Sequence, residues 1–280
     1  LEASSAASDV YKRQRFTLST LPAAEFPTVE AGDGEIDLDL AQPLVRQMID
    51  RTGFAMAQQD VRYYLNGMYL EIKEGRLRFV ATDGHRLALC TAPGQIAADD
   101  KSVIVPRKGI LELSRLLDGD GSVTLCVGSN HIRAATEQFT FTSKLVDGKF
   151  PEYERVLPRS PDKSVSGDRS ELRQAFTRTA ILSNEKYRGV RLSLTPGSLE
   201  ITANNPEQEQ AEESVPVDYA GDALEVGFNV SYLLDVMGVL TGATVRMSLS
   251  DSASSALIEE GESGGDTGAE ALYVVMPMRL

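Results

Sequence analysis

One long pattern occurs twice in this chain, at positions about 120 residues apart. Val80–Gly84 ends a strand pattern in the first copy, and Ile201–Asn205 ends a similar one in the second. Val123–Leu125 and Val245–Met247 correspond in the same way, each behind a helix-like run. Solenoid repeats are shorter, about 20–50 residues. The pattern therefore predicts a duplicated domain, in a molecule built from copies of one module placed side by side. In such a molecule we expect the functional sites on the faces that the copies share and at the boundaries between them.

The length of 280 residues suits two domains. Apolar residues make up 42% of the chain, enough for real cores, and 25% of the residues are charged, as in a soluble globular protein. No apolar run approaches the roughly 18 residues of a membrane helix. Residues 1–14 have no initiating Met, no secretory apolar segment and no periodicity. We expect them to be foreign or disordered, and the chain to be truncated at its N-terminus.

Within each copy, the order of one strand, one helix and three strands occurs twice. The first helix pattern, Ala41–Ala57, has its counterpart at Leu172–Ile181. This order predicts an α+β fold of tandem modules, each with two helices on one face of an antiparallel sheet. We expect a partner's helix layer or solvent on the other face. Three prolines between Val146 and Lys163 mark the boundary, and the modules are expected at 34–153 and 154–280.

The formal net charge is −13, which by itself argues against a nucleic-acid partner. The charge is unevenly distributed, however. The four predicted helices together carry +4, which leaves −17 for the rest of the chain. One interpretation is that helix surfaces simply use arginine. The other is that the helices form one basic face on a protein whose remaining surface is acidic and would repel nucleic acid.

The sequence offers little chemistry. Asp83, His85 and Cys90 lie within eight residues, which suggests a hydrolase as the alternative function. On one continuous strand His85 and Cys90 would point to opposite faces, roughly 16 Å apart, whereas a nucleophile needs its base at about 3 Å. Two histidines without a CxxC or HxxxH motif argue against a metal site, and both cysteines read as buried apolar residues. We therefore predict no catalytic residues, no metal and no cofactor.

Four segments carry a resemblance to a known family: Asp60–Gly67, Ala81–Ala88, Ser183–Lys186 and Val274–Leu280. They closely resemble the bacterial sliding clamp, the beta subunit of DNA polymerase III, and the likeness runs from about Phe16 to the C-terminus. The resemblance implies the DNA clamp fold and a ring-shaped homodimer that encircles duplex DNA and tethers polymerases. Family protomers have three modules. The resemblance implies that the first is missing here, apart from its last strand and a connector at residues 15–33.

The resemblance gives the basic helices a role, because in the family they line the hole of the ring. DNA would be held there by weak contacts with phosphates that do not depend on sequence, which suits sliding. A loop that approaches DNA in the family matches part of this chain as well. The candidate DNA-facing residues are Arg46, Arg51, Gln59, Tyr63, Tyr64, Arg107, Lys108, Arg115, Arg173 and Arg178.

A peptide groove between the two modules is the second implied site. In the family, DNA polymerase subunits and the clamp loader dock short motifs with Leu and Phe anchors there. Apolar walls with adaptable methionines suit this role, and Arg86 with Arg279 would hold backbone or carboxylate groups of the partner. The implied walls are Leu65, Thr82, Gly84, His85, Arg86, Leu87, Pro151, Arg155, Val156, Asn229, Tyr232, Ala253, Ser255, Val274, Val275, Met276, Pro277, Met278 and Arg279.

The third implied site is the ring seam, with Ile181 and Leu182 on one side and Phe16 and Leu18 on the strand left from the first domain. Without that domain we expect the chain to be mainly monomeric and unable to close a ring. A further interpretation is therefore a fragment that keeps peptide docking but loses DNA function. The resemblance implies a cytoplasmic protein with no membrane association.

Overall fold

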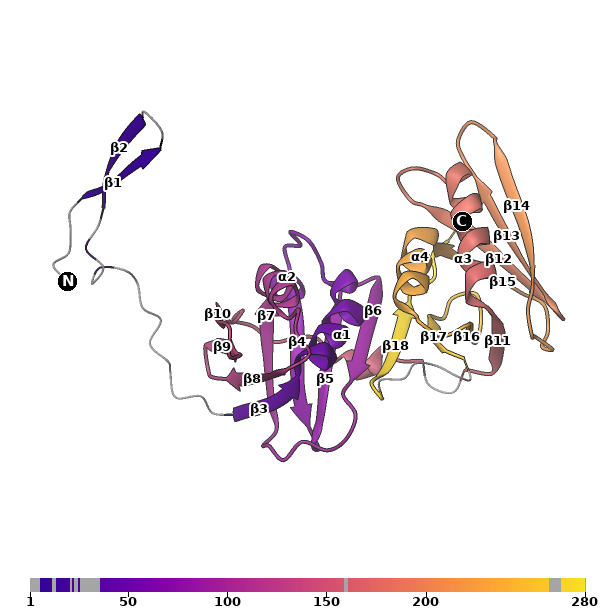
Figure 1. Ribbon diagram of the computed structural model, residues 1–280. Coiled ribbons are helices and arrows are strands. Elements are labelled where there is room, and N and C mark those ends of the chain that lie inside the picture. Colours follow the sequence, from indigo (N-terminus) through magenta and orange to yellow (C-terminus); the bar gives the residue numbers. More distant parts are fainter. Residues whose placement is uncertain are drawn as a thin grey trace. The chain divides into compact units, whose positions relative to one another are not determined.

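The computed structural model describes residues 6–11, 14–20, 22, 25, 36–158, 161–261 and 268–279 (Figure 1). The chain divides into two compact units, Leu1–Asp33 and Gly34–Leu280. In the first unit β1 (Ala6–Tyr11) pairs antiparallel with β2 (Gln14–Ser19). Part of the segment expected to be foreign or disordered, Ala6–Tyr11, is therefore a strand, since a hairpin is held by backbone hydrogen bonds and does not require an apolar repeat. Its foreign origin stays a prediction.

The second unit contains both predicted modules. The described elements of the first module are β3 (Ile36–Ala41), α1 (Gln42–Thr52), β4 (Gly67–Lys73), β5 (Arg76–Thr82), β6 (Arg86–Thr91), β7 (Lys101–Pro106), α2 (Arg107–Leu116), β8 (Ser122–Val127), β9 (His131–Ala135) and β10 (Thr140–Lys144). Those of the second are β11 (Lys163–Asp168), α3 (Arg169–Thr179), β12 (Gly189–Thr195), β13 (Ser198–Asn204), β14 (Gln210–Pro216), β15 (Leu224–Asn229), α4 (Val230–Val239), β16 (Thr244–Leu249), β17 (Ala256–Glu260) and β18 (Glu270–Val275). The predicted order of one strand, one helix and three strands, given twice per module, is confirmed.

One antiparallel sheet runs through both modules. Its strand order is β11-β16-β17-β18-β6-β5-β4-β7, and β18 joins β6 with Tyr273 opposite Ala88. Each module also has a four-stranded sheet, β10-β9-β8-β3 in the first and β14-β13-β12-β15 in the second. Figure 1 shows β18 lying against β6 between the two modules. Backbone hydrogen bonds therefore fix the two modules to each other, and the predicted α+β architecture is confirmed.

The helices pack on the sheets through apolar residues at helical spacing. In α1, Val45, Met48 and Ile49 are buried, and α1 packs against β5 and β6. The α-helical part ends at Thr52, and a 3-10 turn over Gly53–Ala55 replaces the rest of the predicted helix Ala41–Ala57. Helix α2 packs against β4 and β7, and α3 packs beside α4. The helices of both modules therefore bury one apolar face.

In the first module the other face of the long sheet is covered by the segment that joins the two modules, residues 146–158, which we call the connector. The ring of Phe150 stacks on Tyr69 at a centroid distance of 4.6 Å. The Tyr153 hydroxyl donates a 2.5 Å hydrogen bond to Glu71, whose carboxylate also accepts from Arg78. Burial raises the pKa of Tyr153. The expectation of solvent or a partner's helices on this face is therefore wrong here, because the connector supplies apolar and polar partners of its own.

Candidate functional site

The hairpin between β5 and β6 is organised by a carboxylate. Asp83 Oδ1 accepts the backbone N–H groups of His85 and Arg86 at 2.9 and 3.1 Å. Gly84 has φ +90, a conformation that favours glycine. Thr82 lies opposite Leu87 in the last pair of the hairpin, so the turn is wider than the two-residue turn that an Asp-Gly pair usually favours. The Asp83 side chain needs this width in order to reach both N–H groups.

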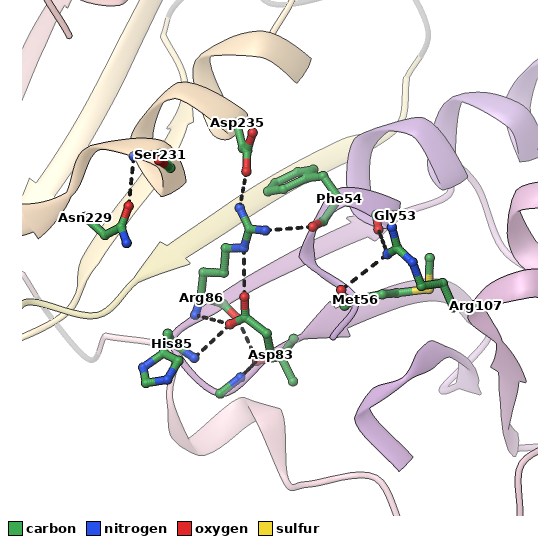
Figure 2. A network of polar contacts seen from close by, with 12 residues as sticks. Gly53, Phe54, Met56, Asp83, His85, Arg86, Arg107, Asn229, Ser231 and Asp235 are labelled. Carbon is green, nitrogen blue, oxygen red and sulfur yellow. Dashed lines mark hydrogen bonds and ion pairs between the residues drawn. The ribbon is translucent and has the colours of Figure 1, made fainter. Parts of the chain in front are cut away.

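Arg86 connects the two modules (Figure 2). Its Nε donates to Asp83 Oδ2 at 3.0 Å and its Nη2 donates to the carbonyl of Phe54 at 2.9 Å. Its Nη1 donates to Asp235 of α4, in the other module. The guanidinium carbon also lies 5.2 Å from the Phe54 ring centroid and 4.6 Å from that of Tyr232. The Arg86 side chain is only 12% exposed, so the prediction that it holds groups of a partner is not supported by its surroundings. It holds the two modules together instead.

A surface formed by both modules lies beside Arg86. The rings of His85 and Tyr232 stack at 6.5 Å with an interplanar angle of 19°. The His85 carbonyl accepts the backbone N–H of Met276 at 2.9 Å, which anchors the C-terminal tail. Met276 is 45% exposed. Asn229 caps α4 by accepting from the Ser231 N–H at 2.9 Å. We call the stacked His85 and Tyr232 rings the groove wall.

The tail continues along a hollow of about 660 Å³ on the second module. Met278 donates its backbone N–H to the Gly227 carbonyl at 2.9 Å. Pro277, which has no N–H to donate, lies between this bond and the one made by Met276. The residues lining the hollow are Arg191, Glu225, Val226, Gly227, Ser252, Ala253, Pro277, Met278 and Arg279. The hollow thus brings together four of the predicted groove residues.

Other predicted groove residues lie elsewhere. Four are buried, because strand pairing and the connector cover them, and their place in the groove stays a prediction: Leu65, Leu87, Val274 and Val275. Thr82 is buried and its hydroxyl donates to the Arg86 carbonyl. Pro151 and Arg155 line a separate hollow of about 720 Å³ beside the connector. Val156 is exposed, and Ser255 is half-buried. The structure therefore supports a smaller surface around the groove wall and the tail.

Three residues of this site were not predicted as parts of it: Phe54, Asp83 and Asp235. Asp83 stood only in the hydrolase alternative, although an Asp-Gly pair before His85 and Arg86 is a signal for a side-chain-braced turn. Asp235 lies 149 residues from Arg86, and no local pattern indicates their contact.

The geometry gives no support to a nucleophile at Cys90. Its thiol is buried, as predicted, and burial raises the pKa of Cys90 to about 11, so the thiolate is scarce at neutral pH. The Asp83 carboxylate is occupied by Arg86 and by backbone donors. Cys126 is only half-buried, which differs from its predicted burial. Within the described ranges no cluster of three or more His, Cys, Asp or Glu could hold a metal ion, and no helix is long and apolar enough to cross a membrane.

Arg51 was predicted to face DNA, and this prediction is wrong. The residue is 5% exposed and lies at the junction of the modules. Its Nη1 donates to the Ala269 carbonyl at 2.9 Å, and its Nη2 lies 3.5 Å from Thr241 Oγ1 and 3.6 Å from Glu260. Helical spacing alone could not show that this side of α1 meets the second module.

The other cations that were predicted to face DNA differ in their exposure and in whether they form ion pairs. Arg46, Arg115 and Arg178 are exposed but paired with Asp50, Glu112 and Glu213. Arg107 is half-buried and directs its Nη1 to the carbonyls of Gly53 and Met56 (Figure 2). Lys108 and Arg173 are exposed and have no ion pair within the described part of the chain. A hollow of about 480 Å³ on α2 is lined by four candidates, Gln59, Arg107, Lys108 and Arg115, among other residues.

The loop that was predicted to approach DNA, at residues 58–66, is braced by hydrogen bonds across its base. Asp60 donates its N–H to Asn66 Oδ1 at 2.9 Å and accepts from Asn66 Nδ2 at 2.8 Å. Gln59 has φ 56, a strained conformation for a residue with a side chain. Tyr63 is exposed and Tyr64 half-buried, with their rings edge-on at 5.9 Å. The loop therefore presents Gln59 and Tyr63 to solvent from a fixed base.

The predicted seam residues are partly open. Ile181 is 73% exposed in the 3-10 turn Ala180–Leu182, and Leu182 is half-buried. Phe16 is exposed on β2 of the first unit. The side chain of Leu18 lies outside the described residues.

Comparisons with known proteins agree with this geometry. The model of the DNA polymerase III beta subunit central domain matches residues 39–152, and that of its C-terminal domain matches 154–279. The beta sliding clamp of Pseudomonas aeruginosa is 65% identical over 270 residues, which cover 96% of this chain and 72% of that protein. The Escherichia coli beta sliding clamp is 55% identical over 269 residues, with the same coverage. A P. aeruginosa sliding clamp crystallised with griselimycin matches with a TM-score of 0.91 and 63% identity, covering 99% of this chain and 74% of that one.

The matches extend over both modules and the junction between them. They confirm the resemblance that the motifs carried, and they confirm the clamp fold. The chain therefore belongs to the family of the DNA polymerase III beta subunit, the beta sliding clamps.

Proposed function

We propose that this chain acts as a DNA sliding clamp subunit that tethers polymerases through a peptide groove. The clamp is a processivity factor that encircles duplex DNA as a ring dimer, and we expect this chain by itself to keep the groove without closing a ring. As a family member it is an accessory subunit and not an enzyme, so the hydrolase alternative is wrong. The observation that carries the groove is the wall formed by the rings of His85 and Tyr232, one from each module, together with the C-terminal tail, which is hydrogen-bonded to the backbone carbonyl of His85.

Apolar and cationic groups make this surface suitable for a short Leu- and Phe-containing motif. Met276 and Met278 offer flexible, polarisable side chains that adapt to different partners. Arg279 is exposed at the rim, where it would attract a carboxylate. The partners we propose are DNA polymerase subunits and the clamp loader, in the cytoplasm.

We expect a fluorescent peptide with a Gln-Leu-…-Leu-Phe motif to bind this chain saturably. The double variant Met276→Ala/Met278→Ala should bind it about 10-fold more weakly, because truncating anchor residues costs about 1–2 kcal/mol. Anisotropy titration measures both affinities. Leu116→Ala is the matched control, since it shortens an exposed apolar side chain on α2 and should leave the affinity unchanged. A folded chain without saturable binding would contradict the groove.

The DNA-facing role that we propose is carried by the exposed cations of α2 and α3, since Arg51 of α1 is buried. Lys108 and Arg173 are exposed candidates with no ion pair in the described chain, so binding a phosphate would not require them to give up an acidic partner. Arg178 and Arg115 would have to exchange Glu213 and Glu112 for phosphate. Weak contacts of this kind would hold DNA without stopping its movement.

Salt titration tests this role. We expect the chain to bind duplex DNA measurably at about 20 mM salt and barely at about 150 mM. Lys108→Ala/Arg173→Ala should reduce the slope of log K against log salt by about 2, roughly 0.9 for each lost phosphate contact. Arg246→Ala removes one exposed cation of the β16 strand and serves as the control. An unchanged slope in the double variant would show that these two residues do not contact phosphates.

For the ring we propose a seam that includes Ile181 and Leu182. The exposed Ile181 supports this proposal, because covering its apolar surface in a seam would be favourable. The oligomeric state of the chain, including the expectation of a monomer that keeps peptide docking, stays a prediction.

A further inference from the structure

Arg62 is held in one geometry by the frame of the 58–66 loop. Its Nε and Nη2 donate to the two oxygens of the Asp60 carboxylate at 3.0 and 2.9 Å. Asp60 is itself fixed by the two hydrogen bonds to Asn66. The hydrogen bonds from Arg62 lower the pKa of Asp60 to about 2, so the pair stays charged under ordinary conditions. A side chain on an exposed loop is thus unusually well defined.

The same guanidinium rests on the hairpin that carries the groove wall. Arg62 Nη2 donates to the Asp83 carbonyl at 3.2 Å. A Cβ on Gly84 would lie 2.9 Å from Arg62 Nη1, so the guanidinium occupies space that is free only because residue 84 is glycine. The loop and the hairpin are therefore in direct contact through one cation.

From this contact the hydrogen bonds continue to the wall. The Asp83 carboxylate fixes the N–H groups of His85 and Arg86. His85 then stacks on Tyr232 and accepts from the Met276 N–H. Arg62 itself makes no recorded hydrogen bond, ion pair or ring contact with Tyr232 or Met276 in the described chain. Any effect of Arg62 on the wall would act through the backbone of residues 83–85.

We propose that Arg62 is a positioning residue for partner-peptide binding: by holding the Asp83–His85 backbone, it sets the place of the His85 ring against Tyr232. This inference rests on the proposed peptide groove. It assigns to the 58–66 loop, which was expected to approach DNA, a second role in ordering the docking site on the neighbouring hairpin.

Peptide titration without DNA tests the inference, because any DNA contact of the loop is then silent. We expect Arg62→Ala to weaken binding of the Gln-Leu-…-Leu-Phe peptide by about 3- to 10-fold, the range of coupling between neighbouring groups. Asp60→Asn, which removes the anchor of Arg62 and leaves the hairpin untouched, should give a smaller loss in the same direction. Arg246→Ala is the matched control, since its side chain is 44% exposed against 46% for Arg62 and is also ion-paired, at 3.1 Å.

A double-mutant cycle separates positioning from a general effect on the fold. If Arg62 acts through the His85 ring, the loss caused by Arg62→Ala should fall below about 2-fold when His85→Ala is already present. An equal loss in both backgrounds overturns the inference, and so does an unchanged affinity of Arg62→Ala while the wild-type chain binds. Absence of binding by the folded wild-type chain is a different result: it removes the proposed groove, and the inference falls with it.

Discussion

Arg51→Met should lower the free energy of unfolding by about 3 kcal/mol, the scale of breaking a buried ion pair from one side. The substitution keeps most of the apolar stem but removes the donors to the Ala269 carbonyl, Thr241 and Glu260. Glu260 would then stay largely desolvated and would keep only uncharged donors in the described chain, the N–H and hydroxyl of Thr241 and the backbone of Gly242. Chemical denaturation of both proteins measures the difference.

Two controls give this measurement its meaning. Arg246→Met removes an exposed pair with Glu259 and should cost less than about 1 kcal/mol. Arg51→Met/Glu260→Gln removes both charges and should recover part of the loss, because a buried pair can be replaced more cheaply than it can be broken. Equal costs for Arg51→Met and Arg246→Met would contradict a buried role at the junction.

The same pair predicts a dependence on pH. Burial acts to raise the pKa of Glu260, but hydrogen bonds from Thr241 and the charge of Arg51 outweigh it and lower the pKa below its usual 4.5. A carboxyl with a depressed folded pKa contributes stability above its unfolded pKa and loses it as pH falls through the folded value. The gap between wild type and Arg51→Met should therefore narrow below about pH 4. The gap should not close, because the hydrogen bond to Ala269 does not titrate.

The sequence was enough to predict the modules because their signals are local. Period-two strands and the apolar spacing of Val45, Met48 and Ile49 repeat within each copy. The end of α1 at Thr52 was not predicted, since the apolar pattern continues through Phe54 into a different kind of turn. The role of Arg51 was missed for another reason. Its carbonyl partner, Ala269, lies 218 residues away, and nothing near Arg51 in the sequence distinguishes it from the exposed Arg46.

For the site, too, the sequence predicted features set by neighbouring residues and missed contacts between residues far apart in the chain. The motifs implied that His85, Arg86 and Met276 share one site, and in the structure the His85 carbonyl accepts the N–H of Met276. The motif did not show what Arg86 binds, because Asp235 and Tyr232 come from the other module. Nor could it show that Leu87 and Val274 face inward, since each strand of a sheet covered on both faces carries apolar residues on both sides.

Arg86→Met should weaken peptide binding by about 10-fold or more and destabilise the chain by about 2–3 kcal/mol, although the arginine itself is hardly exposed. The change removes the cation between the Phe54 and Tyr232 rings and the donors to Asp83 and the Phe54 carbonyl. Tyr232 would lose its support across the module boundary, and the groove wall would no longer be held in place. Parallel peptide titration and denaturation report both effects.

Two further variants decide how Arg86 acts. Asp235→Asn breaks only the inter-module ion pair, and because Asp235 is largely solvated the stability loss should stay below about 1 kcal/mol. Arg86→Lys keeps the charge but cannot donate to Asp83, Phe54 and Asp235 at once, so it should resemble Arg86→Met. Wild-type affinity in Arg86→Lys would mean that charge alone matters at this position. That outcome would favour direct attraction of the partner over support of the wall, and it would restore the role that the sequence first suggested.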